Sequence, residues 1–168
     1  FDRMSQSRFQ RFRRKVAGHE QHQLEVYRNA SQKAAFESAM RNAIADPYSD
    51  DEYNAATARI KAYHGANPQG LPSESISLSI EKDISRLTAQ RIARIVDDNP
   101  IGARNMLDAQ KDRLLPGDLD RLSKMVERGA LDQDALNTAD KIILESDDYG
   151  SQVSAARQIK DADLRDAV

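Results

Sequence analysis

The sequence predicts an all-α fold, in which a long N-terminal helix is followed by a bundle or irregular array of about six shorter helices. Apolar residues recur at spacings of three and four, as they do on one face of an amphipathic helix. Proline, glycine and capping residues interrupt these patterns at short intervals. No segment alternates apolar and polar residues and β-branched residues do not cluster, so the sequence contains no strand signal.

The first part of the chain is expected to form one long helix followed by a helical hairpin. No proline occurs from Asp2 to Ala45, and the single glycine in this stretch costs about 1 kcal/mol without ending a long helix. Asp46-Pro47 then ends it. Ser49 and Glu52 match a capping box, with serine at the N-cap and glutamate three residues later. A second helix is therefore expected, ending at Gly65.

A loop is expected at residues 66–73, where helix-breaking residues are concentrated. Eight of the nine aromatic residues lie before it, whereas twelve of the thirteen leucines lie at or after Leu71. This change in composition places the main boundary of the chain at the loop. The two parts are residues 1–65, which are basic at their start, and residues 74–168, which are rich in leucine and isoleucine.

The helix that follows the loop has the clearest amphipathic pattern in the chain. It is expected to start at Ser73. Its apolar face consists of Ile76, Ile80, Ile84, Leu87 and Ile95. Because such a face is stable only when it is covered, the pattern predicts packing against neighbouring helices.

The remaining helices are predicted mainly from their termini. Asn99 can cap a helix whose first residue is Pro100, and Pro116 can open the next helix, which is expected to end at Gly129. Each of these helices carries an apolar stripe that it cannot bury alone. Asp132 is then expected to cap another helix, and Ser151 to Val168 is expected to form one further helix or two short ones.

Composition excludes several classes of protein. The chain has 168 residues, of which 31% are charged and only 5% aromatic, a profile typical of long solvated helices with narrow apolar stripes. A net charge of −2 gives no overall attraction to nucleic acid or membranes. The absence of cysteine excludes disulfides, thiolate chemistry and cysteine-type zinc sites. No apolar run approaches the roughly 20 residues of a membrane span.

Because the chain begins with Phe1 and not with methionine, we expect it to be a piece of a longer polypeptide.

The start of the chain is basic. Residues 1–20 carry a net charge of +4, against −6 for the remainder. The candidate contact cations are Arg8, Arg11, Arg13, Arg14 and Lys15. Such a helix could contact nucleic-acid phosphates or an anionic membrane, or its aromatic residues could pack on a neighbouring protein while the cations face water. The candidate assembly contacts are Phe9, Phe12, Tyr27 and Phe36.

No catalytic or metal-binding constellation is predicted. His19 and His22 are one residue closer together than the two histidines of the zincin motif, and no third ligand is evident. Two Glu-Ser pairs, Glu37-Ser38 and Glu145-Ser146, match the catalytic position of lytic transglycosylases. The downstream segments of those enzymes, however, are missing. We therefore expect a non-enzymatic chain with no metal, cofactor or small-molecule substrate.

Several short segments occur in the same order as in a known family. They are Leu24-Glu25-Val26-Tyr27, Ala45-Asp46-Pro47-Tyr48, Ala93-Arg94-Ile95, Asp98-Asn99-Pro100, Ala103 with Leu107, Asp112-Arg113-Leu114, Leu119 with Leu122, and Ile159-Lys160-Asp161-Ala162-Asp163-Leu164-Arg165. In this order, roughly residues 20–168 resemble the N-terminal helical region of internal virion proteins of tailed bacteriophages. Those proteins lie inside the capsid near the portal or are ejected with the DNA. In some members a lytic transglycosylase domain lies elsewhere in the chain.

The resemblance implies a structural, non-enzymatic segment that assembles with itself and with other virion proteins, such as portal or core components, during capsid assembly or genome delivery. The implied location is the virion interior or, after ejection, the envelope of the host cell, with DNA contact through the basic N-terminal helix. One alternative is a helical region that accompanies a peptidoglycan lytic transglycosylase in the same parent chain. The other is a cellular helical-repeat adaptor. A weak internal repeat of about 45 residues, in which Asp163-Leu164 corresponds to Asp118-Leu119, would support it.

Overall fold

The computed structural model describes residues 2–67, 70–146 and 148–168, and the all-α prediction is confirmed. Within the described residues there is no β-strand. The elements are α1 (Asp2–Ala45), α2 (Asp50–Gly65), α3 (Ser73–Val96), α4 (Pro100–Gln110), the short 3-10 helix η1 (Lys111–Arg113), α5 (Pro116–Glu145), α6 (Tyr149–Arg157) and α7 (Ala162–Ala167). The predicted long first helix is thus present, followed by shorter ones.

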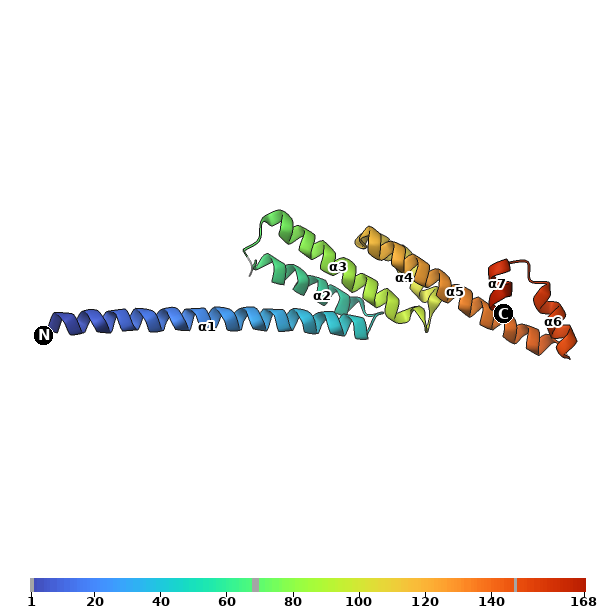
Figure 1. Ribbon diagram of the computed structural model, residues 1–168, viewed down its shortest axis with the longest axis horizontal. Coiled ribbons are helices and arrows are strands. Elements are labelled where there is room, and N and C mark those ends of the chain that lie inside the picture. Colours follow the sequence, from blue (N-terminus) through green and yellow to red (C-terminus); the bar gives the residue numbers. More distant parts are fainter. Residues whose placement is uncertain (1, 68–69, 147) are drawn as a thin grey trace.

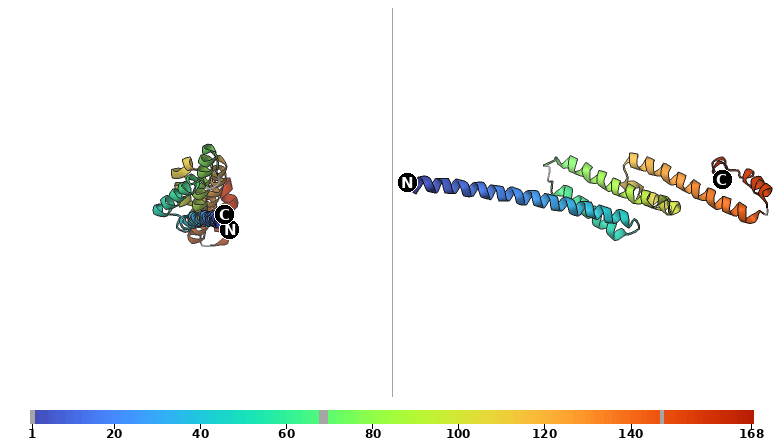
Figure 2. Two further views of the ribbon diagram at one scale, coloured as in Figure 1. Left: turned by 90° about the vertical axis from the view of Figure 1, so that its left-hand side faces the viewer. Right: turned by 60° about the horizontal axis from the view of Figure 1, so that its bottom comes forward.

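The helices form an elongated array with the two ends of the chain far apart (Figure 1). The C-terminal part of α1 packs against α2 and α3, and its N-terminal part extends away from the other helices. Helices α4 and α5 pack on α3, while α6 and α7 contact the C-terminal half of α5 at the opposite end (Figures 1 and 2).

Local capping explains where several helices begin. Ser49 Oγ accepts a hydrogen bond from the backbone N–H of Glu52 at 3.2 Å, as the predicted capping box requires. Asn99 Oδ1 accepts one from the Gly102 N–H at 2.8 Å, and Pro100 occupies the first position of α4. These bonds satisfy N–H groups that have no partner within the helix. The predicted starts of α2 and α4 are therefore confirmed.

The core consists of two clusters that share α3. The first lies between α1, α2 and α3 and contains Ala43, Tyr53, Ala56, Ile60 and Leu87. The second lies between α3, η1, α4 and α5 and contains Ala89, Ile92, Ile95, Val96, Ala103, Leu107, Leu114, Leu122 and Val126. The predicted loop at 66–73 matches the connection between α2 and α3 except for its last residue, because Ser73 is the first residue of α3; residues 68–69 lie outside the described residues. Because α3 completes both clusters, this break in the chain does not separate two independent cores.

The predicted helix end at Gly129 and the predicted new start at Asp132 are wrong. Helix α5 runs without interruption from Pro116 to Glu145. Gly129 instead allows two helices to pack closely. A Cβ at this position would lie only 2.8 Å from Val96 Cγ1 and 3.5 Å from Pro100 Cβ. The missing side chain lets α5 pass close to the junction of α3 and α4.

Candidate interaction surfaces

The projecting part of α1 is the most exposed regular element in the described chain. Every residue from Arg8 to Arg28 is exposed, which corresponds to about 30 Å of helix at 1.5 Å per residue. Burial begins near Asn29 and continues through Phe36 and Met40 to Ala43. Residues 8–28 of α1 therefore have no covering partner among the described residues.

The five predicted contact cations all lie on this projecting part. They are Arg8, Arg11, Arg13, Arg14 and Lys15, and all are exposed. No acidic residue occurs between the first and the last of them. Among the described residues, no ion pair involves any of the five, and Arg13 instead lies over the Phe9 ring at 5.9 Å from its centroid. Residues 8–15 thus carry a concentrated positive charge without an ion-pair partner among the described residues.

Three of the four predicted assembly residues are exposed on the same projection. Phe9, Phe12 and Tyr27 are 62%, 65% and 73% exposed. Phe9 and Phe12, together with Val16, are spaced by three and four residues and so share one stripe of the helix. We call these three residues the apolar stripe of α1. Large aromatic side chains contribute strongly when an interface covers them.

Phe36 does not belong with the other three. Its ring stacks on that of Tyr63, with the centroids 5.1 Å apart and the planes inclined by 16°, and it is partly buried against the first core cluster. The structure therefore places Phe36 inside the packing of α1 on α2. Spacing along the sequence could not show this, since the partner ring lies 27 residues away.

A buried arginine that was not among the predicted site residues anchors the turn between α1 and α2 to α3. Arg91 Nη2 donates hydrogen bonds to the carbonyl oxygens of Pro47 at 2.6 Å and of Ser49 at 3.2 Å, in the turn between α1 and α2. Its guanidinium lies 4.3 Å from the centroid of the Tyr53 ring, whose hydroxyl is 3.0 Å from Thr88 Oγ1. Desolvation by burial lowers the pKa of Arg91 from its ordinary value. An arginine on the apolar face of α3 was the available signal.

A second buried polar group fixes the start of α5. Ser85 Oγ donates to Asp118 Oδ2 at 2.6 Å and accepts from the Leu115 N–H at 2.8 Å. The N–H of Leu115 precedes the helix and would otherwise lack a partner. This bridge ties α5, and with it the far end of the molecule, to α3.

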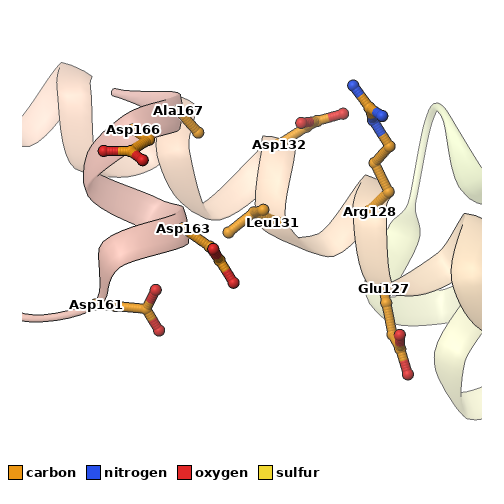
Figure 3. Close-up of a pocket in the computed structure, with 8 residues that line it drawn as sticks. All are labelled: Glu127, Arg128, Leu131, Asp132, Asp161, Asp163, Asp166 and Ala167. Carbon is orange, nitrogen blue, oxygen red and sulfur yellow. The ribbon is translucent and has the colours of Figure 1, made fainter.

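At that far end a groove lies between α5 and α7 (Figure 3). Its volume is about 680 Å³. We call it the acidic groove, because five carboxylates and one guanidinium line it, together with two apolar residues. The lining residues are Glu127, Arg128, Leu131, Asp132, Asp161, Asp163, Asp166 and Ala167. A smaller apolar hollow adjoins it, with Asp132 and Ala167 in common, and adds Ala135, Leu136, Ala139 and Val168.

The residues considered for chemistry are scattered. His19 and His22 are exposed on α1, and His19 Nε2 lies 3.1 Å from Gln23 Nε2. Among the described residues, no group of three or more histidine, aspartate or glutamate side chains is arranged to hold a metal ion. Glu37 pairs with Lys33 at 3.9 Å on the surface of α1, and Glu145 is exposed at the end of α5. The two Glu-Ser pairs thus lie on different elements.

Comparisons with protein-family models, with curated proteins and with solved structures found no match for this chain. In the part of the chain that the structure describes, no helix combines the length and the apolar content needed to cross a bilayer. The surfaces of the molecule, above all the projecting part of α1, are therefore the basis for assigning a function.

Proposed function

We propose that this chain is a non-enzymatic assembly element that associates with copies of itself through the projecting part of α1. The observation that carries the proposal is the unbroken exposure from Arg8 to Arg28. A helix without tertiary packing is only marginally stable in water, and most helical stability in proteins comes from covering an apolar face. A partner that covers the apolar stripe of α1 would stabilise the helix and remove two phenylalanine rings from water.

The resemblance of residues 20–168 to internal virion proteins of tailed phages supports a finer proposal. The chain would then be a structural segment of such a protein that contacts portal or core components during capsid assembly or genome delivery. Its location would be the virion interior or, after ejection, the host cell envelope. The exposure of Glu37 and Glu145, on separate elements, favours this structural role over a catalytic one.

Sedimentation velocity over a concentration series from about 1 µM to about 1 mM tests the assembly proposal, because a modest interface associates in this range. The wild-type chain is expected to self-associate. The double variant Phe9→Ser/Phe12→Ser is expected to weaken this association by about tenfold or more, since each buried phenylalanine contributes about 1.5–3 kcal/mol. At a concentration where both proteins are monomeric, its melting temperature should equal that of the wild type, because both rings are exposed in the monomer.

The chain offers a matched control. Leu78 and Ile101 are 65% and 62% exposed, almost the same as Phe12 and Phe9, but they lie on α3 and α4. Leu78→Ser/Ile101→Ser should therefore associate like the wild type. A wild-type chain that stays strictly monomeric throughout the series, with α1 helical by circular dichroism, would contradict the proposal.

A further inference from the structure

The two ends of the molecule carry opposite charge. At one end, five cations follow one another on the projecting part of α1 with no acidic residue among them. At the other end, the acidic groove combines five carboxylates with a single guanidinium (Figure 3). Net charge does not reveal this separation, because the opposite charges nearly cancel over the whole chain.

The two surfaces also match in their apolar parts. The stripe of α1 presents Phe9, Phe12 and Val16 beside the cations. The acidic groove contains Leu131 and Ala167, and the hollow that adjoins it is lined largely by apolar side chains, including Leu136, which is 62% exposed. A helix could therefore lay its aromatic side on the hollow while its arginines meet the carboxylates. Charge complementarity of this kind selects the partner and fixes its orientation.

The basic segment cannot reach the groove of its own chain. It is part of an unbroken helix, and it extends away from α2 and α3, whereas α7 lies at the opposite end of the molecule (Figures 1 and 2). Folding α1 back would break a helix of 44 residues. The complementary groove must therefore come from another molecule.

We propose that residues 8–16 of one copy dock into the acidic groove of a second copy. This inference rests on the proposed function and names the partner surface for the projecting helix. The contact is heterologous, because a helix at one end meets a groove at the other, so every pair of copies keeps one free helix and one free groove. Further copies therefore add head to tail, and the assembly grows as an open chain unless the rotation between copies closes it into a ring.

Salt gives the first test. The contacts join exposed charges, which ions screen over about 10 Å at about 0.1 M salt. The apparent dissociation constant of the wild-type chain should rise by about tenfold or more between about 50 mM and about 500 mM salt. Association that does not respond to salt would overturn the proposal.

Two variants test the two surfaces separately, one by removing positive charges from the projecting helix and the other by removing negative charges from the acidic groove. The helix variant is Arg11→Gln/Arg13→Gln/Arg14→Gln. The groove variant is Glu127→Gln/Asp132→Asn/Asp163→Asn. It leaves Asp161 intact because that side chain caps α7 by accepting from the Leu164 N–H at 3.0 Å. The matched controls change three exposed charges elsewhere: Lys61→Gln/Arg104→Gln/Lys141→Gln for the cations and Asp97→Asn/Asp108→Asn/Asp112→Asn for the carboxylates.

Each variant alone should lose about tenfold or more in self-association, while both controls behave like the wild type. An equimolar mixture of the helix and groove variants should form heterodimers and nothing larger. The reason is that the mixture contains one intact helix, on the groove variant, and one intact groove, on the helix variant. A head-to-tail interface predicts this rescue, whereas a symmetric helix-to-helix interface does not.

Three results would overturn the inference. If the groove variant associates like the wild type while Phe9→Ser/Phe12→Ser does not, the projecting helix assembles by another contact, and only the proposed function stands. If the wild type is monomeric even at low salt, both proposals fail. If it is monomeric but binds a DNA duplex of about 20 base pairs, and the helix variant does not bind, the partner of the basic segment is nucleic acid.

Discussion

Replacing Gly129 by alanine tests the close approach of α5 to α3. Two effects oppose each other at this position. Alanine is a better helix former than glycine by about 1 kcal/mol, which would stabilise a continuous α5. The added methyl group, however, would lie 2.8 Å from Val96 Cγ1, well inside the optimal carbon–carbon separation of about 3.5–4.0 Å.

The packing cost should exceed the gain in helix propensity. Val96 is almost completely buried, and its β-branched side chain has little rotamer freedom, so relief requires α5 to shift. Pro100 Cβ and the Val96 carbonyl oxygen, both 3.5 Å from the added methyl, leave little room for such a shift. Overpacking of this kind costs about 1–3 kcal/mol. We therefore expect Gly129→Ala to lower the free energy of unfolding by about 1 kcal/mol.

Urea denaturation followed by circular dichroism measures this change. The m-values of wild type and variant should be equal, which checks that both unfold in the same two-state transition. Gly117→Ala, in the same helix, is the control, because a Cβ there meets nothing within 4 Å. In a Val96→Ala background the conflict disappears, and Gly129→Ala should then stabilise the protein. If Gly129→Ala stabilises the otherwise wild-type protein, α5 does not approach Val96 as closely as described.

Two further substitutions test the buried anchor and an exposed cap. Arg91→Lys should lower the free energy of unfolding, measured by thermal denaturation, by about 2–3 kcal/mol, because an ammonium group stays buried but cannot replace both hydrogen bonds of the guanidinium to the carbonyls. Arg91→Met should lower it less, because it removes the buried charge. Equal stability of the wild type and the lysine variant would contradict this expectation. Hydrogen bonds from the Ser151 N–H and hydroxyl lower the pKa of Asp148. Its contribution to α6 is therefore present above the ordinary aspartate pKa of about 3.9 and is lost as pH falls through the lowered folded value. Amide NMR shifts of Ser151 should follow this titration in the wild type and show no such step in Asp148→Asn.

Part of the candidate site could be predicted from the sequence. The five cations and the exposed aromatic residues Phe9, Phe12 and Tyr27 were identified because they cluster within one uninterrupted helical segment. The same reasoning grouped Phe36 with them, although its ring is partly buried and stacks on Tyr63 of another helix. Helical spacing shows which residues share a face. It does not show which faces a distant element covers.

The acidic groove and the buried anchor could not be predicted in this way. The groove combines residues from the middle of α5 with residues beside and within α7, more than 28 positions apart. Arg91 falls on the apolar face of α3, but the carbonyl groups that bind it belong to the turn at Pro47 and Ser49, more than 40 residues earlier in the chain. Both features depend on contacts between segments that are remote along the chain.

The sequence by itself determined the all-α class and several helix starts. Ser49 and Asn99 bond to N–H groups three residues away, and Pro100 and Pro116 restrict their own backbone, so these signals act within a single turn. Only the tertiary structure decided that α5 continues through Gly129, that α3 belongs to both core clusters, and that residues 8–28 of α1 remain exposed. The physical reason is that capping is a local interaction, whereas the packing of a glycine or the exposure of a helix face depends on elements that meet only after folding.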